Sequence, residues 1–113
     1  MIRKLEYNLI EQLANTFQQN YGYYLINDVS SIMQQIRDYF QNTAPDNEIF
    51  IDVIKYTLIS GEPYLMFGIN RKGDNFLQYI LLSRNSNYWN RSAISYERYK
   101  EGIFISDPFA KEF

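Results

Sequence analysis

The feature that most constrains the fold is a change in hydrophobic spacing at Glu48. Before this residue, apolar side chains recur at steps of three and four, whereas after it β-branched and aromatic residues alternate along the chain. The first spacing places apolar side chains on one face of a helix, and the second is typical of strands. The sequence therefore predicts an α+β fold in which helices come first and strands follow.

Two amphipathic helices are predicted before the change. The first covers about residues 2–20, where Gly22 provides a C-terminal stop. The second covers about residues 28–42, is capped by Asn27 or Asp28, and cannot continue through Pro45. The apolar face of the first helix consists of Ile2, Leu5, Leu9, Leu13 and Phe17.

Three antiparallel strands are predicted after the change, over about residues 48–60, 63–70 and 75–83. The turn sequences "SGEP" and "RKGD" separate them. A further strand over about residues 102–106 would raise the number to four. We therefore expect two N-terminal helices on one face of a sheet of three to four strands, in a single domain over residues 1–113.

Two residue types are missing from the sequence, which contains neither cysteine nor histidine. Thiol nucleophiles, Cys/His zinc sites and imidazole acid–base chemistry are therefore excluded. The spacing of a calcium loop and the glycine-rich phosphate-binding motifs are also missing. Asp52, on an apolar strand, is the best candidate for an acid–base group, although such a residue is usually a solvated acid. We predict a non-enzymatic protein with no catalytic residues, cofactor or metal.

Location and charge narrow the class of protein further. Glu6 and Glu11 interrupt any signal-peptide core, and no apolar run approaches the roughly 20 residues that span a bilayer. A cytoplasmic protein without a membrane partner is expected. The net charge is −2, but residues 71–100 carry six basic and two acidic side chains, whereas residues 1–70 carry four and eight. Positive charge is therefore concentrated in the second half.

The segment "SRNSNYWNRSAISYERYKEG", residues 83–102, is the main candidate for a functional site. Tryptophan, tyrosine and arginine are the residue types enriched at protein-interface hot spots. Serine and asparagine between the aromatics resemble the composition of adaptable binding loops. The predicted partner-binding residues are Arg84, Tyr88, Trp89, Arg91, Tyr96, Arg98 and Tyr99, with Arg71 and Lys72 as a secondary contact.

Our leading hypothesis is a small protein-binding module, of the inhibitor, immunity or anti-defence type found among bacterial and phage accessory proteins. It would dock on a larger protein with an acidic surface. Pairing of an exposed edge strand would also allow a homodimer.

Other interpretations of the same residues stay open. Residues 83–102 are also compatible with a packed crossover in which Trp89 fills the core. The basic region 71–100 suits a nucleic-acid-binding protein or a metal-independent nuclease, because aromatic side chains stack on bases and cations pair with phosphates. A small-molecule pocket between helices and sheet is a further alternative, with a lining of Tyr23, Tyr24, Tyr39 and Phe67.

Overall fold

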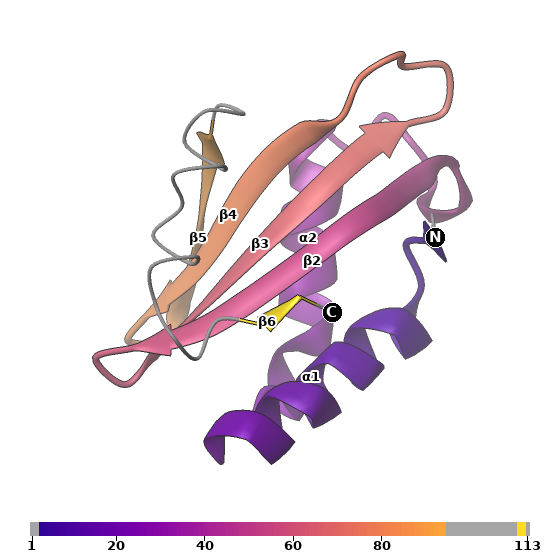
Figure 1. Cartoon of the computed structure of the whole chain (residues 1–113). Coiled ribbons are helices and arrows are strands. Elements are labelled where there is room, and N and C mark those ends of the chain that lie inside the picture. Colours follow the sequence, from indigo (N-terminus) through magenta and orange to yellow (C-terminus); the bar gives the residue numbers. More distant parts are fainter. Residues whose placement is uncertain (1–2, 95–110, 113) are drawn as a thin grey trace.

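The computed structural model of the protein describes residues 3–94 and 111–112 and confirms an α+β fold with N-terminal helices (Figure 1). The structure contains two short 3-10 turns, η1 (Ile26–Asp28) and η2 (Asp46–Glu48). The helices are α1 (Tyr7–Tyr21) and α2 (Val29–Tyr39). The strands are β1 (Arg3–Lys4), β2 (Ile49–Ile59), β3 (Glu62–Arg71), β4 (Gln78–Asn85), β5 (Tyr88–Ile94) and β6 (Lys111–Glu112).

The sheet of the described residues is antiparallel and follows the order β1-β2-β3-β4-β5, with β6 beside β2. The predicted number of three to four strands is therefore wrong, because β1 and β5 extend the sheet at its two ends. The three strands predicted from alternation are confirmed as β2, β3 and β4. The predicted strand at 102–106 lies outside the described residues.

The core lies between the helices and one face of the sheet, as the sequence predicted (Figure 1). Phe17 of α1, Ile36 of α2 and Phe67 of β3 are completely buried in it. Burial of each such side chain is worth roughly 1.5–3 kcal/mol relative to leaving it in water. Contacts between the helices and the strands therefore supply most of the stability that holds the two layers together.

The first helix begins later than residue 2, because the chain before Tyr7 is extended. Arg3 and Lys4 pair with β2, and the backbone N–H of Leu5 donates to the carbonyl of Ile49 at 2.9 Å. Gly22 ends α1 as predicted, with a φ of 68° and an N–H that donates to Gln18. These bonds bring the start of α1 to the edge of the sheet.

The second helix ends at Tyr39 rather than near residue 42. Gln41 and Asn42 both have a φ of 56°, a left-handed conformation that a helix cannot accommodate. The chain therefore turns before it reaches Pro45, and it reaches β2 through η2.

Strand β5 lies at residues 88–94, where no strand was predicted from the sequence. In register with β4, Trp89 lies opposite Arg84, and Arg91 lies opposite Leu82. Polar residues occupy both faces of β5, so its sequence has no hydrophobic alternation. The hairpin that precedes it turns at Ser86, which has a φ of 59°, instead of at the glycine typical of such turns.

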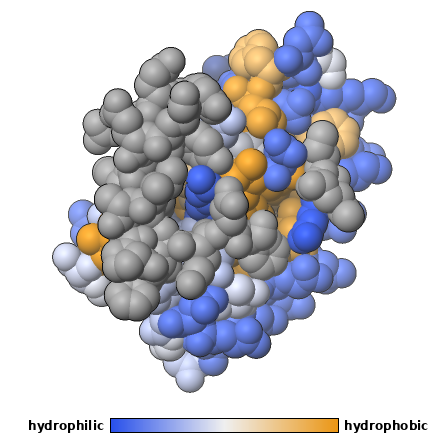
Figure 2. All heavy atoms as spheres, viewed as in Figure 1, coloured by the Kyte–Doolittle hydropathy of each residue, from blue (hydrophilic) through white to orange (hydrophobic). Residues whose placement is uncertain are grey.

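The face of the sheet that points away from the helices is mixed in character. Hydrophobic and hydrophilic side chains lie side by side on it (Figure 2). Alternation along β2 and β3 directs Thr57 and Met66 to this face, and both are fully buried. Among the described residues, no helix is sufficiently long and apolar to cross a membrane.

Candidate functional site

The β4–β5 hairpin and the connection between α1 and α2 lie at one end of the molecule (Figure 1). Arg84, near the end of β4, joins them. Its Nη1 donates to the hydroxyl of Tyr23 at 2.8 Å and lies 3.5 Å from Oδ2 of Asp28. The hydrogen bond to Tyr23 and the nearby carboxylate of Asp28 raise the pKa of Arg84, which therefore stays charged. One arginine thus fixes the hairpin against the helical layer.

Trp89 belongs to the same end and packs on the core of its own chain. The indole is partly buried against the hydrophobic cluster. Its Nε1 is buried, and among the described residues it has no hydrogen-bond acceptor. The position of this side chain agrees with the packed-crossover interpretation.

Arg91 is also used within the chain. Its Nη1 donates to the carbonyl oxygen and to Oε1 of Gln35, at 3.0 and 3.2 Å. Its guanidinium carbon lies 6.0 Å from the ring centre of Tyr39. The Nε2 of Gln35 in turn donates to the carbonyl of Trp89 at 3.2 Å. These contacts fasten α2 along β5.

Two aromatic side chains at this end of the molecule are instead largely exposed to solvent. Tyr88 is 75% exposed and Tyr24 is 66% exposed. Tyr24 directly follows Tyr23, whose hydroxyl accepts from Arg84, and Tyr88 directly precedes Trp89. We call these five residues the hairpin-end surface: Tyr23, Tyr24, Arg84, Tyr88 and Trp89. The other predicted contacts, Tyr96, Arg98 and Tyr99, lie outside the described residues.

The predicted secondary contacts lie at the opposite end of the sheet. Arg71 ends β3, and Lys72 follows it in the loop to β4. Lys72 forms a long ion pair with Glu48, with 3.9 Å between Nζ and Oε1. Because β4 runs the length of the sheet between this loop and Arg84, these two residues do not join the hairpin-end surface (Figure 1).

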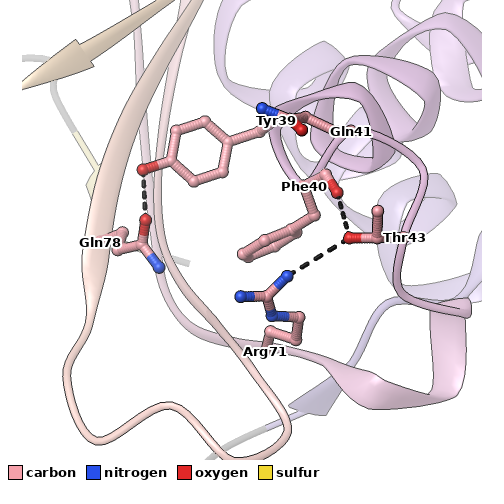
Figure 3. Close-up of a pocket in the computed structure, with 6 residues that line it drawn as sticks. All are labelled: Tyr39, Phe40, Gln41, Thr43, Arg71 and Gln78. Carbon is pink, nitrogen blue, oxygen red and sulfur yellow. Dashed lines mark hydrogen bonds between the residues drawn. The ribbon is translucent and has the colours of Figure 1, made fainter.

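A pocket of about 490 Å³ opens where α2 ends, and we call it the α2-end pocket (Figure 3). Arg71 Nη1 donates to Thr43 Oγ1 at 3.3 Å, and the guanidinium carbon lies 5.6 Å from the ring centre of Phe40. The hydroxyl of Tyr39 donates to Oε1 of Gln78. The lining consists of Tyr39, Phe40, Gln41, Thr43, Arg71 and Gln78.

The predicted small-molecule pocket is not assembled in the proposed form. Of its four residues, Tyr39 lines the α2-end pocket, whereas Tyr23 and Tyr24 belong to the hairpin-end surface and Phe67 is sealed in the core. Sequence reasoning named Arg71 only as a secondary partner contact, and it did not name the other lining residues of this pocket, although a signal for the position of Arg71 was present. In the β2–β3 hairpin, the end of β3 lies beside the start of β2. Arg71 therefore lies opposite Ile49 and close to the turn that precedes β2.

Within residues 3–94 and 111–112, no group of three or more acidic side chains is arranged to hold a metal ion.

Comparison with protein-family models, with curated proteins and with solved structures found no significant match to this chain. The function is therefore inferred from the side chains described above.

Proposed function

We propose that the protein is a non-enzymatic binding module of the inhibitor, immunity or anti-defence type, and that it docks on a larger protein through the hairpin-end surface. The observation that carries this proposal is the exposure of Tyr88 and Tyr24 on a fixed base. A tyrosine offers a large contact area with few rotatable bonds, and its hydroxyl tolerates water before a partner arrives.

The base of this surface supports the proposal because it limits the entropy lost on binding. The hydrogen bond from Arg84 to Tyr23 and the packing of Trp89 each fix a residue directly adjacent to one of the exposed rings. A surface that is already ordered loses less conformational freedom when a partner docks. The two exposed tyrosines would therefore act as anchors, and their neighbours would exclude water around them.

Charge would have a secondary role in this contact. Asp28 already lies beside Arg84, and Gln35 already accepts from Arg91. Both arginines keep part of their surface in solvent. We propose that acidic groups on the partner orient the complex at its rim, and that the aromatic side chains supply most of the affinity.

The proposal is tested by placing a photo-crosslinking amino acid at position 88 or 24 in the native host. Phe76, 65% exposed in the loop at the opposite end of the sheet, is the matched control position. We expect the same partner to be trapped from positions 88 and 24, and not from position 76. Trapping from position 76 alone would place the contact at the other end of the molecule and contradict the proposal.

Affinity for the purified partner then separates a true contact from mere proximity. Tyr88→Ala is expected to weaken binding by about 10- to 100-fold, the range of interface hot spots. Phe76→Ala is expected to change binding by less than about twofold, because it lies outside the contact. Equal effects of the two substitutions would overturn the assignment of Tyr88 as an anchor.

A further inference from the structure

The α2-end pocket presents two hydrogen-bond donors that the protein itself leaves unused. Arg71 uses Nη1 on Thr43, and its Nε lies 3.7 Å from a carboxylate oxygen of Asp74. Gln78 accepts from Tyr39 through Oε1, which turns its amide nitrogen toward the pocket. Within the described part of the chain, neither Nη2 of Arg71 nor Nε2 of Gln78 has an acceptor, and Figure 3 shows both groups directed into the same opening.

The backbone at the rim of the pocket gives an independent observation. Gln41 and Asn42 both adopt a left-handed conformation that is costly for residues other than glycine. Asn42 is explained by its side chain, which donates to Asp38 and accepts from Gln34. Gln41 lines the pocket, and no other described residue forms a hydrogen bond with its side chain. The side-chain amide of Gln41 is therefore available to a ligand at the rim of the pocket.

The charges around the pocket define the ligand that it would accept. Arg71 provides one positive charge, and Thr43, Gln78 and Tyr39 are neutral polar groups. The carboxylate of Asp74 and the C-terminal end of α2 both repel negative charge, so a ligand with one negative charge suits this pocket better than a ligand with two. A carboxylate carries one charge and two acceptor oxygens, which matches one guanidinium and one amide donor. The rings of Tyr39 and Phe40 suit an apolar or planar group beside it.

We propose that the α2-end pocket binds a small monocarboxylate, which is held by Nη2 of Arg71 and Nε2 of Gln78 and has its apolar part against Tyr39. The pocket volume of about 490 Å³ lies in the range of small-molecule sites. This site lies at the other end of the sheet from the hairpin-end surface. A test of ligand binding here is therefore independent of the test of partner docking.

Benzoate is the probe, added to the uniformly ¹⁵N-labelled full chain and followed by amide chemical shifts. Benzamide, which has the same shape without the charge, and inorganic phosphate are the comparison ligands. We expect benzoate to shift residues 39–43, 71 and 78, with a dissociation constant of about 1–10 mM for a ligand of this size. Benzamide and phosphate should each bind at least about tenfold more weakly.

Substitutions assign the donors. Arg71→Lys keeps the positive charge but loses the planar guanidinium group with its paired N–H donors. This substitution should weaken benzoate binding about tenfold. Lys72→Gln removes a neighbouring charge outside the pocket and should change binding less than about twofold. Gln41→Gly should weaken binding several-fold without lowering the unfolding temperature, because glycine relieves the backbone strain. This last variant keeps the test decisive if Arg71→Lys does not fold.

Several results would overturn the site. One is benzoate shifts that are absent at about 20 mM, or spread over the molecule instead of over the pocket. Another is equal binding of benzamide, which would show that the charge is not recognised. Tighter binding of phosphate would remove the assignment to monocarboxylates. Unchanged benzoate binding in both Arg71→Lys and Gln41→Gly would place any bound benzoate elsewhere.

Discussion

At the scale of single residues, the shortest ion pair among the described side chains joins Arg37 and Asp46. Nε and Nη2 of Arg37 donate to the two carboxylate oxygens of Asp46, each at 2.8 Å. These hydrogen bonds lower the pKa of Asp46, and partial burial opposes them only in part. The pair joins the last turn of α2 to η2, and so it fixes the approach to β2.

The lowered pKa of Asp46 predicts a contribution to stability that depends on pH. A carboxyl group with a lower pKa in the folded state stabilises the fold above its unfolded pKa of about 3.9, and this contribution disappears as the pH falls through the folded value. Because both side chains are about one-third exposed, we expect Asp46→Asn to lower the free energy of unfolding at pH 7 by only about 0.5–1 kcal/mol.

Urea unfolding of the wild type and of Asp46→Asn at pH 7 and near pH 2.5 measures this contribution. The difference between the two proteins should be present at pH 7 and should shrink at the acidic pH. A difference of the same size at both pH values would show that the substitution acts through packing rather than through the charge of Asp46.

The neighbours Tyr88 and Trp89 show what residue composition can and cannot predict. Composition predicted that the segment containing both residues is a contact surface, but it could not decide which of the two side chains would face a partner. Successive residues of a strand point to opposite faces, so this choice depends on the register of β5. In the structure, Trp89 packs on the core and Tyr88 is exposed. The contact predicted for Tyr88 stays a prediction.

At the scale of secondary-structure elements, β5 depends on α2 for the cover of one of its edges. Gln35 donates to the carbonyl of Trp89, and Arg91 donates to Gln35 in return. An unpaired strand edge readily pairs with other chains. The amide of Gln35 occupies one carbonyl that such pairing would use, so the contact both stabilises β5 and protects it.

Replacing Gln35 should loosen β5 while the rest of the sheet stays intact. We expect Gln35→Ala to cost about 1 kcal/mol, the net value of a lost hydrogen bond, and to speed amide hydrogen exchange in residues 88–92. Gln19→Ala, on the exposed surface of α1, is the control and should leave exchange unchanged. Equal exchange rates in β5 for wild type and Gln35→Ala would mean that β4 alone holds the strand.

The elements that the sequence predicted well are those with a regular apolar pattern. The helices and β2, β3 and β4 each bury one hydrophobic face, and periodicity reports such burial directly. Strand β5 has no comparable pattern, because Arg91 faces the helices and is satisfied by Gln35. That partner lies on α2, far away in the sequence. The α2-end pocket likewise depends on Arg71 meeting Thr43, a contact that follows from sheet register and not from local pattern.

At the scale of the whole molecule, positive charge that is concentrated in the sequence is divided in space. Arg71 and Arg84 lie at opposite ends of the sheet. Ion pairs join Arg37 to Asp46, Arg71 to Asp74, Lys72 to Glu48 and Arg84 to Asp28. The described residues therefore do not combine these cations into one basic stripe of the kind that tracks a nucleic-acid backbone.

This division of charge predicts weak binding to polyanions, and it separates the docking proposal from the nucleic-acid alternative. Affinity for a polyanion depends on the number of phosphates or sulfates neutralised together, and it falls steeply with salt when that number is large. We expect the protein to leave a heparin column below about 0.15 M salt. Arg84→Gln should elute at the same salt concentration, because the charge of Arg84 is already matched by Asp28.

Retention well above that salt concentration, if reduced by Arg84→Gln, would favour nucleic-acid binding at the hairpin end. The exposed tyrosines would then serve as stacking platforms for bases rather than as anchors for a protein.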